Sequence, residues 1–206
     1  MTRDAKILVA DDDPQMQLAI QSSLSRCGYQ LTMVGDGKSA TEMLESDSFD
    51  LVITDQRMPG MTGIEFLKQA AEMRAQTVRI ILTGYTDVGD LVEAVNSGVV
   101  YKYITKPWVN TNLQQTVKRS IEHYETTRGQ HLLAQENERL DKRLRTTVHG
   151  VVTTIREMIS QKSSNLGEHC RRTSEFAALI GARFKLEPGE TEHLIFAGLL
   201  HEIPNM

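Results

Sequence analysis

Residues 50–63, DLVITDQRMPGMTG, decide the fold of the first half of this chain. The stretch opens with a short apolar run and continues through Asp55 into a Pro/Gly turn, which is typical of a buried strand that ends at a sheet edge. Four similar runs occur along residues 1–120. We expect strands at Lys6–Ala10, Leu31–Val34, Asp50–Thr54, Val78–Leu82 and Tyr101–Ile104.

Amphipathic stretches separate these apolar runs and predict helices. The expected helices are Pro14–Cys27, Gly37–Glu45, Gly63–Arg74, Val88–Ser97 and a long one that begins near Asn110. Strands that are apolar on both faces are typical of a parallel sheet covered by helices. Five successive strand–helix units therefore predict an α/β fold, a doubly wound (βα)5 sheet with right-handed crossovers.

Composition excludes several classes of protein. The 206 residues carry 27 acids and 23 Lys/Arg, a net charge of −4, which argues against binding nucleic acid through bulk charge. No apolar run approaches the roughly 20 residues that span a membrane, and the N-terminus does not resemble a signal peptide. Cys27 and Cys170 stand alone, so we expect two reduced thiols in a cytoplasmic protein without a membrane anchor.

The long helix carries an apolar repeat at an average spacing of 3.5 residues, which is typical of a coiled coil. One position of the repeat is filled by Leu133, Leu140, Thr147 and Thr154, and the other by Asn137, Leu144, Val151 and Met158. We expect a homodimer through residues 126–161. The alternative is a solvated helix that packs on its own domain.

A polar segment at residues 162–167 interrupts the helical pattern, and two further helices are expected at Glu168–Phe184 and Pro188–Glu202. No strand-like run occurs after residue 110, so the C-terminal extension should be all-α. The predicted domains are therefore 1–125, an α/β domain; 126–161, a helical linker; and 162–206, a helical segment.

Chemically active side chains follow four of the five expected strands. Because the carboxyl ends of parallel strands meet at one edge of a sheet, we expect these side chains to lie together. Three carboxylates so placed repel one another unless a cation neutralises them, and Mg²⁺, or Mn²⁺, suits such an oxygen-rich site. No organic cofactor is expected. The residues are Asp11, Asp12, Asp55, Thr83, Gly84 and Lys106.

This combination of groups suits phosphoryl transfer. A carboxylate held beside Mg²⁺ is a competent nucleophile, and attack by Asp55 would give an aspartyl phosphate. The transferred group needs a cation and hydrogen-bond donors on its oxygens, which Lys106 and Thr83 offer. Gly84 leaves room for the phosphoryl group to approach.

Residues 1 to about 125 resemble the receiver domain of two-component response regulators. The matching motifs are ILVADDDP (7–14), DLVITDQRMPGMTG (50–63), LTG (82–84) and YITKP (103–107). The resemblance implies a flavodoxin-like sheet of order 2-1-3-4-5. It also implies that a sensor histidine kinase or phosphotransfer protein phosphorylates Asp55.

The resemblance also assigns finer roles within the acidic cluster. It implies that Asp12 binds Mg²⁺ directly, that Asp11 helps through water, and that the backbone carbonyl of Arg57 is a further ligand. It implies a cis peptide bond between Lys106 and Pro107. Phosphorylation should draw Thr83 toward the phosphoryl group and open space that Tyr103 fills, which would remodel the neighbouring surface.

Residues 152–203 resemble the opening of an HD-GYP domain, a metal-dependent phosphodiesterase of cyclic dinucleotides. The aligned ligand positions are Glu157, His169, His201 and Glu202. Glu202 stands where the family has an aspartate, and Pro204 follows instead of the usual Gly-Lys. These residues are fewer than the two-metal cluster of that family needs, so we expect a degenerate segment without catalysis.

We weigh three functions. The leading hypothesis is a response regulator whose output passes through the helical linker and the HD-like segment by protein–protein contacts. The second is the N-terminal part, or a shortened relative, of a cyclic-di-GMP phosphodiesterase controlled by its receiver domain. The third, direct DNA binding, is not expected, because residues 151–206 carry six Lys/Arg against seven acids and contain no recognisable helix-turn-helix.

Overall fold

The computed structural model describes residues 5–84, 88–162 and 164–201 of the chain. These residues form two compact units, Met1–Leu133 and Ala134–Met206. The first unit contains all the strands, and the second is helical.

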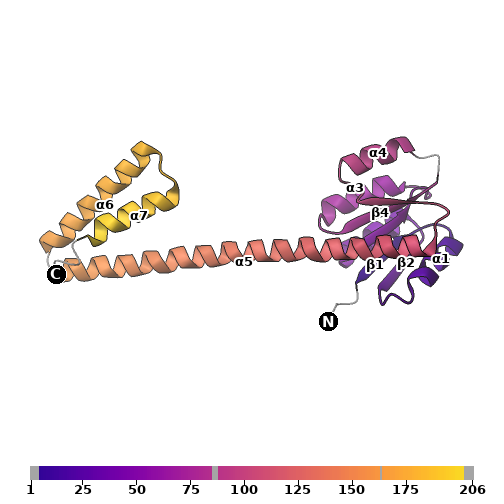
Figure 1. Ribbon diagram of the computed structural model, residues 1–206, viewed down its shortest axis with the longest axis horizontal. Coiled ribbons are helices and arrows are strands. Elements are labelled where there is room, and N and C mark those ends of the chain that lie inside the picture. Colours follow the sequence, from indigo (N-terminus) through magenta and orange to yellow (C-terminus); the bar gives the residue numbers. More distant parts are fainter. Residues whose placement is uncertain (1–4, 85–87, 163, 202–206) are drawn as a thin grey trace. The chain divides into compact units, whose positions relative to one another are not determined.

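The first unit is built on one parallel sheet (Figure 1). Its strands are β1 (Lys6–Ala10), β2 (Gln30–Val34), β3 (Leu51–Asp55), β4 (Val78–Thr83) and β5 (Lys102–Thr105), in the order β2-β1-β3-β4-β5. This confirms the predicted fold class. The register pairs Ala10 with Thr54, Asp55 with Leu82, and Thr83 with Thr105. The carboxyl ends of β1, β3, β4 and β5 therefore lie side by side at one edge of the sheet.

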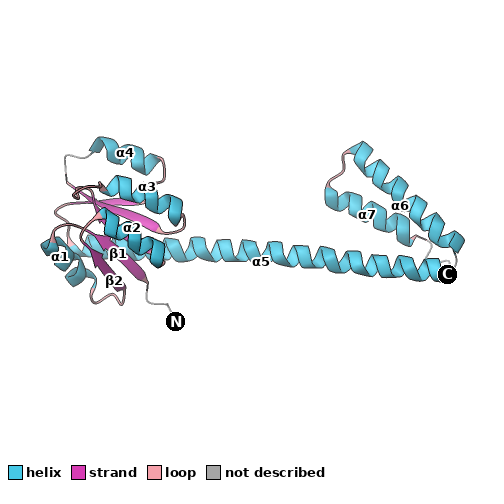
Figure 2. Cartoon of the chain, turned by 180° about the vertical axis from the view of Figure 1, so that it is seen from behind, coloured by secondary structure: helices cyan, strands magenta, loops and turns pink. Residues whose placement is uncertain are grey.

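Helices cover both faces of the sheet (Figure 2). They are α1 (Pro14–Leu24), α2 (Gly37–Ser46), α3 (Gly63–Met73), α4 (Val88–Asn96) and α5 (Asn110–Lys162). Buried side chains of α2, α3 and α4 pack on one face, around Leu8, Val52 and Ile81. Those of α1 and the first turns of α5 pack on the other, around Ile53 and Ile80. The strands are apolar on both faces because each face is covered.

Local capping fixes where the helices near the sheet edge begin. Asp13 accepts a hydrogen bond from the backbone N–H of Gln15 at 2.8 Å, and the following Pro14 starts α1. Thr62 and Glu65 form a capping box at the start of α3, in which each side chain bonds to the backbone of the other residue. Both helices therefore begin directly beside the strand ends that carry the acidic residues.

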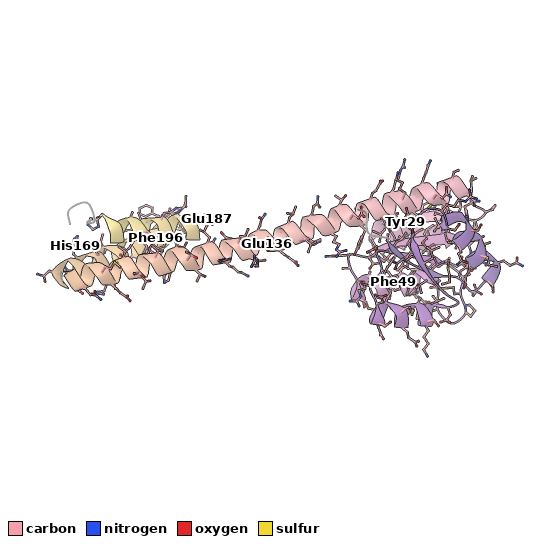
Figure 3. The ribbon with its side chains drawn as sticks, turned by 90° about the horizontal axis from the view of Figure 1, so that it is seen from below. Tyr29, Phe49, Glu136, His169, Glu187 and Phe196 are labelled. Carbon is pink, nitrogen blue, oxygen red and sulfur yellow. The ribbon has the colours of Figure 1, made fainter. Side chains whose placement is uncertain are left out.

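The second unit contains the C-terminal half of α5 and an antiparallel pair, α6 (Ser164–Phe184) and α7 (Pro188–Leu200) (Figure 3). Glycines allow α6 and α7 to approach closely: a Cβ at Gly181 would lie 2.7 Å from the side chain of Thr191, and one at Gly198 would lie 3.3 Å from the carbonyl oxygen of Thr173. Among the helices of the described part of the chain, none is long and apolar enough to cross a membrane.

The prediction that a polar connection extends over residues 162–167 is wrong in its length. The helix α6 begins at Ser164, four residues before the expected Glu168, and the backbone of Gly167 is helical and buried. Ser and Asn are favoured at helix N-termini, where their side chains bond to free backbone N–H groups. The polar residues therefore start the next helix instead of forming a longer connection.

Candidate functional site

Three carboxylates meet at the carboxyl edge of the sheet. Asp11 follows β1 and is 1% exposed, Asp55 ends β3 and is 9% exposed, and Asp12 is exposed. One ligand oxygen from each lies within 4.8 Å of the others. Within residues 5–84, 88–162 and 164–201, this is the one group of three or more His, Cys, Asp or Glu side chains with ligand atoms this close.

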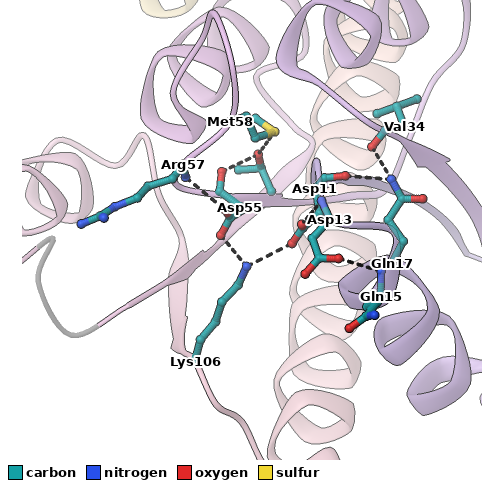
Figure 4. A network of polar contacts seen from close by, with 10 residues as sticks. Asp11, Asp13, Gln15, Gln17, Val34, Asp55, Arg57, Met58 and Lys106 are labelled. Carbon is teal, nitrogen blue, oxygen red and sulfur yellow. Dashed lines mark hydrogen bonds and ion pairs between the residues drawn. The ribbon is translucent and has the colours of Figure 1, made fainter.

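Lys106, which follows β5, joins the two less exposed carboxylates (Figure 4). Its Nζ lies 2.7 Å from Oδ1 of Asp55 and 3.1 Å from Oδ2 of Asp11. The Lys106 backbone N–H also donates to the carbonyl of Thr83 at 2.8 Å, which ties this segment to the end of β4. The peptide bond between Lys106 and Pro107 is cis, as the resemblance implied.

Burial and charge act in opposite directions on this cluster. Burial raises the pKa of Asp11 above its usual value, although the Asp13 amide and Lys106 partly offset the shift. Burial acts to lower the pKa of Lys106, but its hydrogen bond and charge interaction with Asp55 and its contacts with Asp11 outweigh that effect and raise it. Lys106 is therefore a cation near neutral pH, and it neutralises part of the acidic cluster.

Backbone groups orient the two carboxylates. Oδ2 of Asp55 accepts the backbone N–H of Arg57 at 3.1 Å, and Oδ1 of Asp11 accepts that of Asp13 at 3.0 Å. Each carboxylate thus has one oxygen bound to a backbone N–H of the following loop and the other bound to Lys106. This leaves the exposed side of the cluster, where Asp12 lies, for a cation.

Thr83 and Tyr103 both line a cavity of about 350 Å³, together with residues of α4. Thr83 is 2% exposed and its hydroxyl donates to the carbonyl of Gly84 at 3.1 Å. Tyr103 on β5 is 54% exposed. The apolar wall of the cavity is formed by Leu91, Val92 and Val95 of α4.

Two supporting residues were not singled out in the sequence. The side-chain amide of Gln17 donates to the carbonyls of Asp11 at 2.7 Å and of Val34 at 3.1 Å, which holds the ends of β1 and β2 together. Gly63 is needed because a Cβ there would overlap the carbonyl oxygen of Asp55. Two sequence signals could have indicated them. One is a glutamine in the first turn of the helix that follows a strand, and the other is a glycine directly after a capping threonine.

The residues that align with the HD-GYP ligands are only partly brought together. His169 on α6 and His201, which follows α7, approach with their Nε2 atoms 3.2 Å apart. Glu157 is exposed on α5 and does not join them in a three-ligand cluster of described residues. Glu202 lies outside the described residues.

A five-stranded parallel sheet of order 2-1-3-4-5, with this acidic cluster and lysine at its carboxyl edge, defines the CheY-like receiver fold. The sequence pattern of the response regulator receiver domain matches residues 7–118. The chain belongs to the response regulator receiver domain family, so its first unit is the receiver domain of a two-component response regulator.

Relatives of known name agree with this assignment. The chain is 36% identical, over 78% of its length, to the hydrogenase transcriptional regulatory protein HoxA of Cupriavidus necator, of which it covers 31%. It is 32% identical to the transcriptional regulatory protein FixJ of Bradyrhizobium diazoefficiens, over 66% of each chain. The chain thus spans about a third of HoxA.

Among solved structures, the receiver domain of an HD domain-containing protein from Pseudomonas fluorescens is similar, with 32% identity and a TM-score of 0.60. The match covers 63% of this chain and 95% of that one. An adenylate cyclase from Rhodopirellula baltica matches with 28% identity and a TM-score of 0.62, over 65% of this chain and 98% of that one.

Proposed function

We propose that this protein is a response regulator that accepts a phosphoryl group on Asp55 from a sensor histidine kinase or a phosphotransfer protein. The observation that carries the proposal is the bridge from Lys106 to both Asp55 and Asp11 beside a three-carboxylate cluster. This arrangement supplies a nucleophile, a cation for phosphoryl oxygens and a set of oxygen ligands at one sheet edge.

The donor set fits Mg²⁺, because carboxylate and carbonyl oxygens are the ligands that this hard cation prefers. Asp11, Asp12, Asp55 and the backbone carbonyl of Arg57 would hold it. Bound there, Mg²⁺ supplies positive charge to the phosphoryl oxygens. Lys106 lies beside Oδ1 of Asp55 and would pair with a phosphoryl oxygen once Asp55 is phosphorylated.

The response to phosphorylation is proposed to pass through Thr83 and Tyr103. A phosphoryl group adds almost two negative charges and three acceptor oxygens, so the Thr83 hydroxyl gains a stronger acceptor than the Gly84 carbonyl. Tyr103 is half-exposed beside an apolar cavity. Turning its ring into that cavity would bury apolar surface and change the exposed face of α4 and β5.

Acetyl phosphate tests the phosphoacceptor directly. With Mg²⁺ present, the full chain is expected to gain one phosphoryl group by intact mass, and Asp55→Ala is expected to gain none. Glu72→Ala changes an exposed carboxylate on α3 and should behave as wild type. A wild-type chain that stays unmodified, or an Asp55→Ala chain that gains the same mass, would contradict the proposal.

For output we propose three parts: the receiver at 1–125, a helical linker at 126–161 that forms a homodimer, and an HD-like segment at 162–206. Five apolar side chains of the predicted coiled-coil seam are exposed on α5, namely Leu133, Leu140, Leu144, Val151 and Met158. The hydroxyls of Thr147 and Thr154 bond within the helix, to the carbonyls of Arg143 and Gly150, so they can enter an apolar seam.

The similarity to transcriptional regulators does not test whether this chain binds DNA. Residues 151–206 carry six Lys/Arg against seven acids, so they lack the excess of basic residues that phosphate contacts need. Output through protein contacts, without direct DNA binding, stays our prediction.

A second candidate function is metal binding by the HD-like segment, favoured by the contact between His169 and His201. Nδ1 of His201 lies 2.8 Å from the carbonyl oxygen of Gly198, which can only accept, so Nδ1 donates and Nε2 is the ring nitrogen that can act as a metal ligand. Two nitrogens on one tetrahedral Zn²⁺ are about 3.3 Å apart, close to the separation of these Nε2 atoms.

Two imidazoles are fewer ligands than a hydrolytic centre needs, so we propose weak binding without phosphodiester hydrolysis.

Calorimetric titration with Zn²⁺ tests the histidine pair. We expect weak binding to the wild-type chain and at least a tenfold loss of affinity in His169→Ala, because one of two neutral nitrogen ligands is removed. His193→Ala removes an exposed histidine of α7 and should leave the affinity unchanged. Equal affinities of the three proteins would exclude the pair as a site.

A further inference from the structure

An apolar stripe on α6 is uncovered within the second unit. Phe176 and Leu179 are each 65% exposed, Ile180 is 48% exposed and Phe184 is 73% exposed. Their spacing of three and four residues places them on one face of the helix.

The face of α6 that packs on α7 is a different one. Cys170, Ala177 and Gly181 are buried, and a Cβ at Gly181 would meet the side chain of Thr191 on α7. The buried residues thus face α7, while Phe176 and Leu179 face away from it. Since α7 already occupies its own side of α6, the stripe needs a separate partner.

We propose that the stripe is a self-association surface, on which α6 of one copy packs antiparallel against α6 of a second copy. Phenylalanine and the neighbouring aliphatic side chains at these exposures present on the order of 500 Å² per copy. Two copies would together bury roughly 1,000 Å², which is the lower bound for a specific interface. The contact is therefore weak and depends on protein concentration.

Charge selects the antiparallel orientation. Arg172 lies one turn before Phe176 and Arg183 one turn after Leu179, so an exposed arginine lies on either side of the part of the stripe from Phe176 to Ile180. In a parallel pair in register, each arginine would lie beside the same arginine of the second copy, and the like charges would repel each other. In an antiparallel pair centred between Leu179 and Ile180, Arg183 of one copy lies over the ring of Phe176 of the other, a favourable cation–π arrangement.

This contact is independent of the coiled coil proposed for α5. The seam residues of α5 and the stripe residues of α6 are on different helices, and both sets of side chains are exposed. A protein that lacks the α5 contact would still form pairs through α6, so the two proposals fail separately.

Cross-linking in the full chain tests the contact. In a Cys27→Ser background, Ile180→Cys places a thiol beside the centre of the antiparallel pair, whereas Ala182→Cys places one on the opposite, exposed side of α6. A short bifunctional maleimide is expected to link two copies of the first variant several-fold more efficiently than two copies of the second. Equal yields, or none from either, would overturn the proposal.

Sedimentation velocity over a concentration series gives an independent measure. Phe176→Glu/Phe184→Glu is expected to remove the concentration-dependent species while the helix content by circular dichroism stays unchanged; Ala182→Glu is the matched control. The Ile180→Cys link should persist when Leu140→Glu/Leu144→Glu disrupts the α5 seam. Loss of that link in the α5 variant would show that α6 does not associate by itself, and would refute the proposal.

Discussion

Lys106→Met is expected to slow phosphorylation of Asp55 by acetyl phosphate at least a hundredfold. The ammonium that contacts Oδ1 of Asp55 at 2.7 Å is the fixed cation nearest to where phosphoryl oxygens would lie. Removing one preorganised charge-stabilising donor from an active site typically costs a factor of about 10²–10³ in rate. Methionine keeps the length and apolar stem of the side chain, so the change is mainly one of charge. Intact mass over a time course measures the rate.

The same variant should also lower the free energy of unfolding when Mg²⁺ is absent. Asp11 and Asp55 would keep their mutual repulsion without the ammonium, and removing one partner of a buried pair costs about 3 kcal/mol. Because the folded-state pKa of Lys106 is raised above its usual value of 10.5, its stabilisation is complete at neutral pH and is lost as the pH rises through the folded-state value. The difference between wild type and variant should therefore shrink only in strong alkali.

The effect of Mg²⁺ on stability distinguishes loss of the Lys106 charge from simple loss of packing. The variant cluster has one positive charge fewer, so Mg²⁺ should stabilise Lys106→Met more than it stabilises wild type in urea denaturation. Lys102→Met, at the start of β5 and outside the cluster, should change stability by less than about 0.5 kcal/mol. Equal Mg²⁺ effects on wild type and Lys106→Met would contradict the charge argument.

Gly63→Ala is expected to lower the free energy of unfolding by about 3 kcal/mol and to abolish phosphorylation. A Cβ at this first residue of α3 would overlap the carbonyl oxygen of Asp55, a backbone atom that cannot rotate away. Either β3 or α3 must shift, and the carboxylate of Asp55 moves with its backbone. Urea denaturation and the acetyl phosphate assay measure the two effects.

Gly35→Ala is the matched control for this substitution. Gly35 follows β2 near the same sheet edge, but nothing lies within 4 Å of a Cβ built there, and its φ is not in the positive range. Its alanine variant should be as stable as wild type or slightly more so, since alanine restricts the unfolded chain. If Gly63→Ala proved as stable as Gly35→Ala, the close approach of α3 to β3 would not be required.

The receiver unit could be predicted from its sequence because its signals are local. Apolar runs of about five residues, such as KILVA and VRIIL, match β1 and β4 to within one residue. Acids directly after β1 and at the end of β3 meet in space because parallel strands share a carboxyl edge. The second unit was less predictable, since residues 164–167 read as a polar break but begin α6.

The sequence by itself determined the strands, that they are parallel, and the group of acidic and basic residues at one edge, since apolar runs and the residues that follow them are local features of the chain. Only the tertiary structure decided which carboxylates Lys106 joins, that Gly63 must lack a side chain, and that His169 meets His201. It also decided which face of α6 is left uncovered. Such contacts join residues that are far apart along the chain, so they depend on how complete elements pack.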